Sequence, residues 1–166
     1  MTKWMTIVLM MSLFSCDYYI VNPHKHNIGH ISSSDARDHA NFEACFEEHI
    51  FEYYNFSEPA KFRYGKDSLR SYFFTNYDSN GIINDSGYIT IRFVINCQGE
   101  AGRFKITELG LDYQEKKFNS KLVNQLFSLV QQAREWNPSL RGNIPNDSYI
   151  YYTFKIINGE LVEILP

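Results

Sequence analysis

The sequence predicts an α+β domain in which helices cover one face of an antiparallel sheet. Some segments place apolar residues every three or four positions, and others place them at every second position. An Asn-Gly pair at 158–159, between two alternating segments, is a strong hairpin signal. The predicted order of elements is α-α-β-β-α-β-β, and a chain of 166 residues has room for one such domain.

The first residues predict an exported protein. Lys3 is followed by an apolar run over residues 4–14. The run is shorter than the about 20 apolar residues of a membrane-spanning helix, and it has the length of a signal-peptide core. The residues that end at Cys16, with leucine at minus three and serine at minus one, resemble a lipobox. We therefore expect residues 1–15 to be removed and Cys16 to carry a lipid. An ordinary secretory leader and a short buried apolar segment are the alternatives.

Residues 16–34 predict a lipidated cysteine followed by a flexible tether, which leaves residues 35–166 as a single domain. The segment has no sustained apolar period and contains Asn, Pro, Gly and Ser. Its three histidines, at positions 24, 26 and 30, lack the spacing and the neighbouring ligands of a zinc site. We therefore expect no metal there.

Two helices are predicted before the first strand. Asp35 can cap a helix over residues 35–54, and a second helix is expected over 67–76, before a polar loop over 77–86. One face of the first helix carries apolar residues and a histidine at spacings of three and four: Phe42, Cys45, Phe46, His49, Ile50 and Tyr53.

The second half of the chain predicts four strands and one helix. Residues 88–97 alternate between apolar and polar types, and a turn at 98–102 leads into a second strand over 103–109. An amphipathic helix over 119–135 ends before Pro138, because proline cannot continue its hydrogen bonds. The last two strands are expected over residues 149–157 and 160–165, joined by the Asn-Gly turn.

Two cysteines remain once Cys16 is acylated. Cys45 lies on the apolar face of the first predicted helix, and Cys97 continues the buried series of the first strand. Both thiols therefore face the same core, in a compartment that permits disulfides. We predict a Cys45–Cys97 disulfide, with two buried free cysteines as the alternative.

Residues 86–166 also carry a resemblance to a known family. Gly87 opens an alternating strand that turns at Gln98-Gly99, and an amphipathic helix, a Trp136-Asn137-Pro138 segment and a tyrosine-rich strand follow. Features of these kinds in this order resemble the C-terminal domain of TonB and its envelope relatives. The resemblance implies a periplasmic module that binds partners without catalysis, similar to uncharacterised lipoproteins of Bacteroidetes-type bacteria.

The sequence contains none of the common catalytic motifs. It has no Gly-rich phosphate loop, His-Glu-x-x-His, Gly-x-Ser-x-Gly or Cys-x-x-Cys. A net charge of −3 without a basic cluster argues against nucleic-acid binding. We expect a non-enzymatic module, without cofactor or metal, that is lipid-anchored in the bacterial envelope on the periplasmic side of the outer membrane.

The sheet supplies the predicted partner surface. Its outward residues include Tyr88, Arg92, Tyr149 and Tyr151, and Val162 lies in a strand expected at an edge. We expect an envelope protein to contact this face or to add a strand to the edge. The alternative is an enzyme or an inhibitor that uses a cleft between the N-terminal helices and the sheet.

Overall fold

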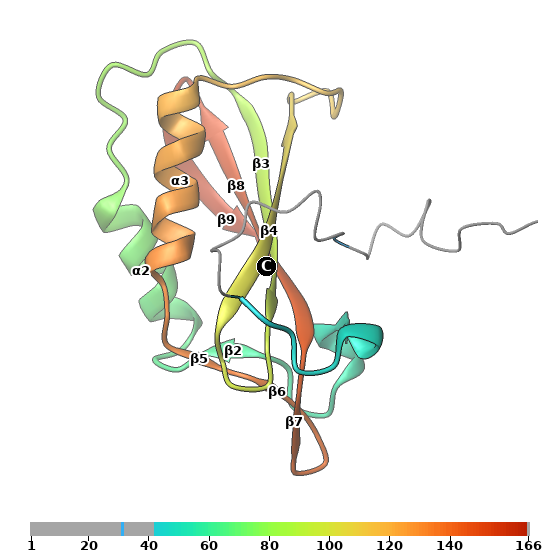
Figure 1. Cartoon of the computed structure of the whole chain (residues 1–166). Helices are drawn as coiled ribbons and strands as arrows, with labels where there is room; N and C mark the ends of the chain where they lie inside the picture. Colours follow the sequence, from blue (N-terminus) through green and yellow to red (C-terminus); the bar gives the residue numbers. More distant parts are fainter. Residues whose placement is uncertain (1–30, 32–41, 166) are drawn as a thin grey trace, which may run out of the picture. The chain divides into compact units, whose positions relative to one another are not determined.

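The computed structural model describes residue 31 and residues 42–165, and these residues contain two α-helices and a mixed β-sheet (Figure 1). The fold is therefore α+β, as predicted. The predicted leader over 1–15, Cys16 and residues 35–41 of the predicted first helix lie outside the described residues. Ile31 is the one described residue of the predicted tether.

The main sheet has five strands. β3 (Gly87–Ile95) pairs antiparallel with β4 (Ala101–Leu109) on one side and with β8 (Ser148–Ile157) on the other. The other side of β8 is shared by β9 (Glu160–Leu165), which is antiparallel, and β1 (Phe51–Glu52), which is parallel. The sheet is thus mixed, whereas we expected antiparallel pairs alone.

The central strand follows the predicted period of two. Ile89, Ile91 and Phe93 are fully buried, and polar or aromatic residues alternate with them. β3 ends at Ile95, two residues before the predicted end, so Cys97 lies in the turn that follows. The alternation therefore predicted the strand and its buried face, and it overestimated the strand's length.

Two glycine turns set the register of the sheet. Between β8 and β9, Asn158 and Gly159 have φ values of 51° and 87°, the left-handed pair that the Asn-Gly signal predicts. Between β3 and β4, Gly99 has a φ of 82°, and a Cβ there would overlap the carbonyl oxygen of Trp136. Glycine is therefore required at this turn both for its conformation and for its close approach to Trp136.

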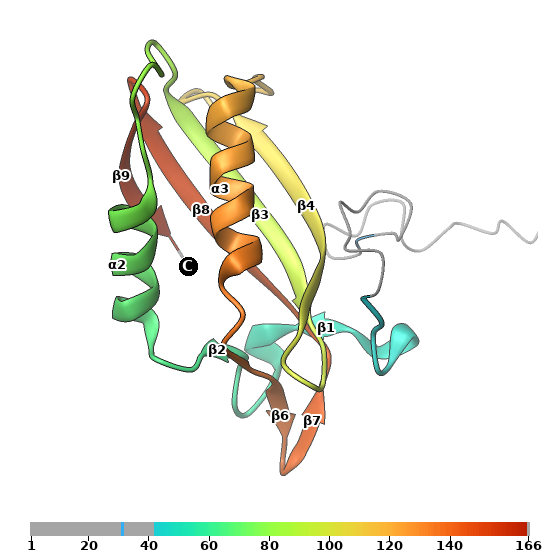
Figure 2. The same cartoon turned by 60° about the vertical axis from the view of Figure 1, so that its left-hand side comes forward.

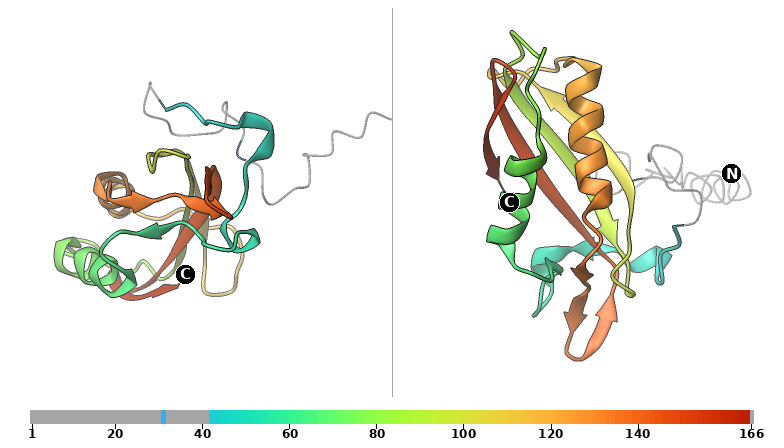
Figure 3. Two further views of the ribbon diagram at one scale, coloured as in Figure 1. Left: turned by 90° about the horizontal axis from the view of Figure 1, so that it is seen from below. Right: turned by 90° about the vertical axis from the view of Figure 1, so that its left-hand side faces the viewer.

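The two helices lie on one face of the sheet (Figures 2 and 3). α2 (Lys66–Asn76) buries Leu69 and Phe73, and α3 (Ser120–Gln132) begins at Asn119, whose side chain accepts from the Lys121 N–H. Both helices were predicted, although α3 ends three residues before the expected position. Neither is long and apolar enough to span a membrane, and no other helix in the described ranges is.

The predicted long helix over 35–54 is wrong for residues 42–54. This segment contains two short 3-10 turns, η1 (Glu47–His49) and η2 (Tyr53–Asn55), with β1 between them. Its backbone groups find partners far along the chain instead of within a helix: β1 pairs with β8, and the Phe46 N–H donates to Asp147. These distant contacts replace the hydrogen bonds that a helix would have made.

Two small sheets lie at the end of the molecule where the strands β1 and β8 begin. β2 (Lys61–Phe62) pairs with β5 (Trp136–Asn137), and β6 (Ser139–Arg141) pairs with β7 (Ile144–Asn146). The β6–β7 hairpin projects from this end (Figure 1). We expected only a loop there.

Candidate binding surface

The main sheet has a helix-covered face and a helix-free face. The helix-covered face contributes to a large apolar cluster that includes Phe93, Phe104 and Phe154. Four cross-strand pairs of β3 and β8 alternate with these buried residues and therefore belong to the helix-free face. They are Tyr88–Lys155, Thr90–Thr153, Arg92–Tyr151 and Val94–Tyr149.

Residues 42–55, which we call the strap, cover one end of the helix-free face. Val94 and Tyr149 are buried there in a small cluster with Ile31, and Phe42 and Ile50 of the strap pack against it. A Cβ at Gly102 would overlap the Phe42 ring, so the absence of a side chain on β4 makes room for the strap.

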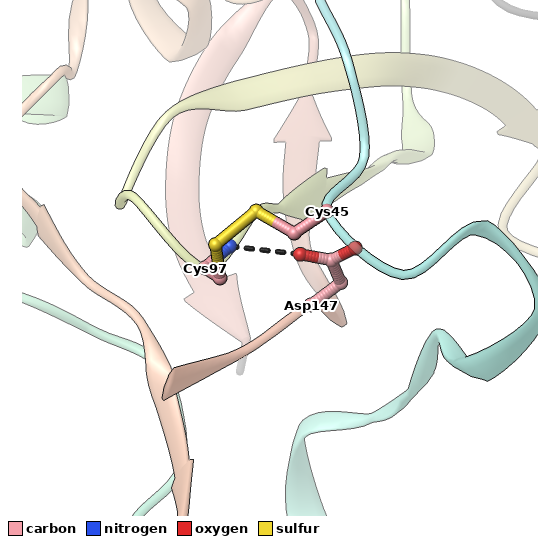
Figure 4. Close-up of side chains that lie close together, drawn as sticks. All are labelled: Cys45, Cys97 and Asp147. Carbon is pink, nitrogen blue, oxygen red and sulfur yellow. Dashed lines mark hydrogen bonds between the residues drawn. A yellow bond between two sulfur atoms is a disulfide. The ribbon is translucent and has the colours of Figure 1, made fainter. Parts of the chain in front are cut away.

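A disulfide and a buried carboxylate hold the strap in place (Figure 4). Cys45 is bonded to Cys97, with a Cα–Cα distance of 6.0 Å, which confirms the predicted disulfide. Asp147 is fully buried beside it and accepts the Phe46 N–H at 2.6 Å and the Cys97 N–H at 2.8 Å. One carboxylate therefore binds the backbone on both sides of the disulfide.

Asn96 makes a second polar connection. Its side-chain oxygen accepts the N–H groups of Gln98 and Glu100, which shapes the β3–β4 turn. Its side-chain nitrogen donates to the carbonyl oxygen of Glu43 in the strap at 3.0 Å and to the Glu100 carboxylate. The same 1% exposed side chain thus organises the turn and binds the strap to it.

Two arginines of the sheet pair with glutamates of the strap. Arg103 makes a two-pronged ion pair with Glu47, and Arg92 pairs with Glu52. Burial raises the pKa of Glu52, and the charge of Arg92 opposes that shift. Arg103 has a φ of 53° and lies where the β3–β4 register shifts, so a β-bulge directs its side chain.

The strap corrects part of the predicted partner surface. Tyr149 is only 3% exposed, and the Arg92 guanidinium lies over its ring at 4.3 Å while pairing with Glu52. The exposure that we expected for Tyr149 is therefore wrong, and Arg92 is only partly exposed. Tyr88 and Tyr151 are both partly exposed, and they remain candidates.

Two groups of tyrosines lie on the helix-free face, and the strap itself contributes two residues, Tyr53 and Tyr54, to one of them. Tyr88 stacks on Tyr113, with ring centroids 5.3 Å apart. Tyr151 contacts Tyr53, which contacts Tyr54 in turn. The Thr90 and Thr153 hydroxyls, 2.8 Å apart, lie on the strands between the two groups. We call this set of five tyrosines the tyrosine surface.

The edge strand β9 is less open than we expected. Val162 is 47% exposed and lies where the β8–β9 register shifts. However, the Arg70 guanidinium on α2 donates to the carbonyl oxygen of Ile164 at 2.6 Å. A partner strand would have to displace this arginine, because strand addition uses the outward carbonyl groups of an edge.

A cavity of about 470 Å³ lies between the β3–β4 turn and the end of α3. Phe42 and Trp136 supply apolar walls, and Arg63 and Arg134 supply charge. Its lining residues include no Ser, Cys, His or Lys, and Glu100 is the one carboxylate among them. The enzyme alternative placed its cleft between two N-terminal helices and the sheet. Of these helices α2 is present, and residues 42–54 do not form the other.

One group of described residues has the types of ligand that bind metals: Cys45, Cys97 and Asp147. The two sulfur atoms are bonded to each other, and both carboxylate oxygens accept backbone N–H groups. Because metals bind thiolates, the oxidised pair offers none. The arrangement is that of a structural connection. Sequence reasoning missed Asp147 and Asn96, because the strap and turn groups that Asp147 binds, and the strap carbonyl that Asn96 binds, are far away in the sequence.

Comparison with known proteins adds no relative. No family model, no curated protein and no solved structure matches this chain.

Proposed function

We propose that the protein is a lipid-anchored, non-enzymatic binding module of the bacterial cell envelope that contacts a partner protein through the helix-free face of its sheet. The tyrosine surface is the observation that carries this proposal. Tyr113 and Tyr54 are 68% and 64% exposed, and tyrosine gives a large contact area at a low cost in side-chain entropy.

The order of elements is compatible with the proposed relationship to TonB C-terminal domains. β3, β4 and α3 follow one another as strand, strand and helix, and the three short strands β5, β6 and β7 separate α3 from β8. The resemblance supports partner binding by a sheet, and the Cys45–Cys97 disulfide is consistent with an oxidising compartment such as the periplasm. Contact through the face is favoured over strand addition at β9, because Arg70 occupies a carbonyl group of that strand.

Site-specific photo-crosslinking in cells tests the partner surface. A photoreactive phenylalanine analogue at Tyr113 or Tyr54 is expected to capture the same discrete envelope protein. The matched control is Tyr64, which is 63% exposed and contacts Phe62 beside the helix-covered core. Equal capture at Tyr64, or no adduct at either test position, would contradict the proposal.

Metabolic labelling with a fatty acid tests the anchor. We expect the wild-type chain to incorporate the label and partition into detergent, because acylation at Cys16 adds membrane affinity. Cys16→Ser is expected to abolish both. A wild-type protein that stays unlabelled and aqueous would rule out the lipid anchor, although it would leave the tyrosine surface intact.

A further inference from the structure

We propose that Val94, Tyr149, Phe42 and Ile50 form a socket for one aliphatic side chain of an extended peptide, and that Ile31 is the chain's own occupant of this site. Ile31 is fully buried against Val94 and Tyr149, and Phe42 and Ile50 pack on the same cluster. Its backbone N–H donates to the Tyr149 hydroxyl at 3.4 Å, across 118 positions of sequence.

The socket is held together independently of Ile31. Phe42 and Ile50 belong to the strap, which the Cys45–Cys97 disulfide and the buried Asp147 carboxylate fix to the sheet. Val94 lies in the centre of the sheet, where β3 pairs on both sides. The walls can therefore keep their positions when the occupant leaves.

The bonds that hold Ile31 itself are of a different kind. Within residues 42–165, packing and a hydrogen bond to a side chain hold it, and neither is covalent. A residue held in this way exchanges with a competitor of similar chemistry, whereas the strap beside it does not. Ile31 therefore acts as a displaceable plug.

The chemistry of the socket selects the ligand. All four of its walls are hydrocarbon or aromatic, so an Ile, Leu or Val side chain fits and a charged one does not. The Tyr149 hydroxyl adds an acceptor for a backbone N–H. The neighbouring Arg92 is already paired with Glu52. The ligand is thus an uncharged aliphatic residue in an extended segment of a partner, and this use of the site rests on the proposed binding function.

A peptide in trans tests the socket without any envelope partner. The probe is residues 27–35 of this sequence, Asn-Ile-Gly-His-Ile-Ser-Ser-Ser-Asp, blocked at both ends. Binding is followed through the methyl resonances of Val94 in the full chain. The Ile31→Ala chain is expected to bind the probe about 10-fold to 100-fold more tightly than wild type, because its socket is vacated. A probe with Asp in place of its second isoleucine should not shift these resonances.

Matched controls separate the socket from general effects. Ile83→Ala removes an isoleucine that is 76% exposed and should bind the probe as wild type does. A retained disulfide and an unchanged circular dichroism spectrum establish that Ile31→Ala is folded. Equal affinity of the wild-type and Ile31→Ala chains, equal binding of the two probes, or no saturable binding would overturn the proposal. None of these results depends on lipidation or on crosslinks at the tyrosine surface.

Discussion

The two faces of the main sheet are stabilised in different ways. The helix-covered face is a continuous apolar core in which Phe93, Phe104 and Phe154 are fully buried. The helix-free face has a small apolar cluster at one end, and a disulfide, a buried carboxylate and two ion pairs hold the strap over it. The stability of the helix-covered face depends on how its side chains fill the core. The stability of the helix-free face depends on a few specific bonds between distant residues.

The largest effect is expected from a cavity on the helix-covered face. Phe93 stacks on Phe104 and packs edge-on against Trp136, so Phe93→Ala removes contacts from the centre of the core. We expect the free energy of unfolding to fall by about 3 to 5 kcal/mol, measured by urea denaturation. Phe46→Ala is the control on the strap, because Phe46 is 45% exposed, and it should cost less than about 1 kcal/mol. Similar losses for the two variants would remove the distinction between core and strap.

The second effect concerns the disulfide. The Cys45→Ser and Cys97→Ser double variant opens a covalent loop of 52 positions and should lower the free energy of unfolding by about 2 to 4 kcal/mol. Hydrogen exchange sharpens the comparison, since amides of the strap should lose protection while those of β3 keep it. An equal loss of amide protection in the strap and in the strands of the sheet would show that the strap does not open separately from the sheet.

These differences explain what could be predicted from the sequence. The strand around Ile89, Ile91 and Phe93 and the turn at Asn158 depend on neighbouring residues, and both were predicted correctly. The conformation of the strap depends on partners far away in the chain, which the local sequence does not reveal. Its apolar residues are spaced by three and four positions, and this spacing predicts a helix. Arg103 reaches Glu47 because a bulge turns the strand locally, and the alternating pattern contains no sign of it.

The disulfide was predicted correctly, but not for the right structural reason. We placed Cys45 on a helix and Cys97 at the end of a buried strand. In the structure Cys45 lies at a bend of the strap, and Cys97 lies in a turn; both are half-buried. Two parts of the reasoning were correct: two cysteines remain after Cys16, and both lie near one core. Asp147, which positions both backbones, was not predicted because its role depends entirely on tertiary contacts.

The third effect concerns this carboxylate. Asp147→Asn keeps the shape of the side chain but leaves one acceptor oxygen where two backbone N–H groups need one each. We expect a loss of about 1 to 3 kcal/mol in the free energy of unfolding, because a buried N–H remains without its charged partner. Asp78→Asn, at an exposed position, is the matched control and should be nearly neutral. An unchanged Asp147→Asn protein would show that the buried carboxylate is not needed to position the strap.

The smallest effect is a dependence on alkaline pH that arises on the helix-covered face. Tyr152 contacts Phe73, Phe93 and Trp136, and burial raises its pKa to about 12, with Tyr53 adding to the shift. The unfolded chain releases this proton near pH 10. The contribution of Tyr152 to stability is therefore complete below pH 10 and is lost as the pH rises from about 10 to about 12.

Replacing the hydroxyl group tests this origin of the pH dependence. Tyr152→Phe keeps the ring and removes the proton, so its free energy of unfolding should fall less than that of wild type above pH 10. The difference in this fall is expected to be about 1 kcal/mol at pH 11, since the ionised side chain is favoured in the unfolded chain alone. Tyr64→Phe, at a 63% exposed position, is the control and should follow the wild-type curve. If Tyr152→Phe also follows that curve in urea denaturation at pH 9, 10 and 11, alkaline sensitivity does not come from this tyrosine. Tyr77 and Tyr149 would then be the next candidates, because burial raises the pKa of both, to about 12 for Tyr77.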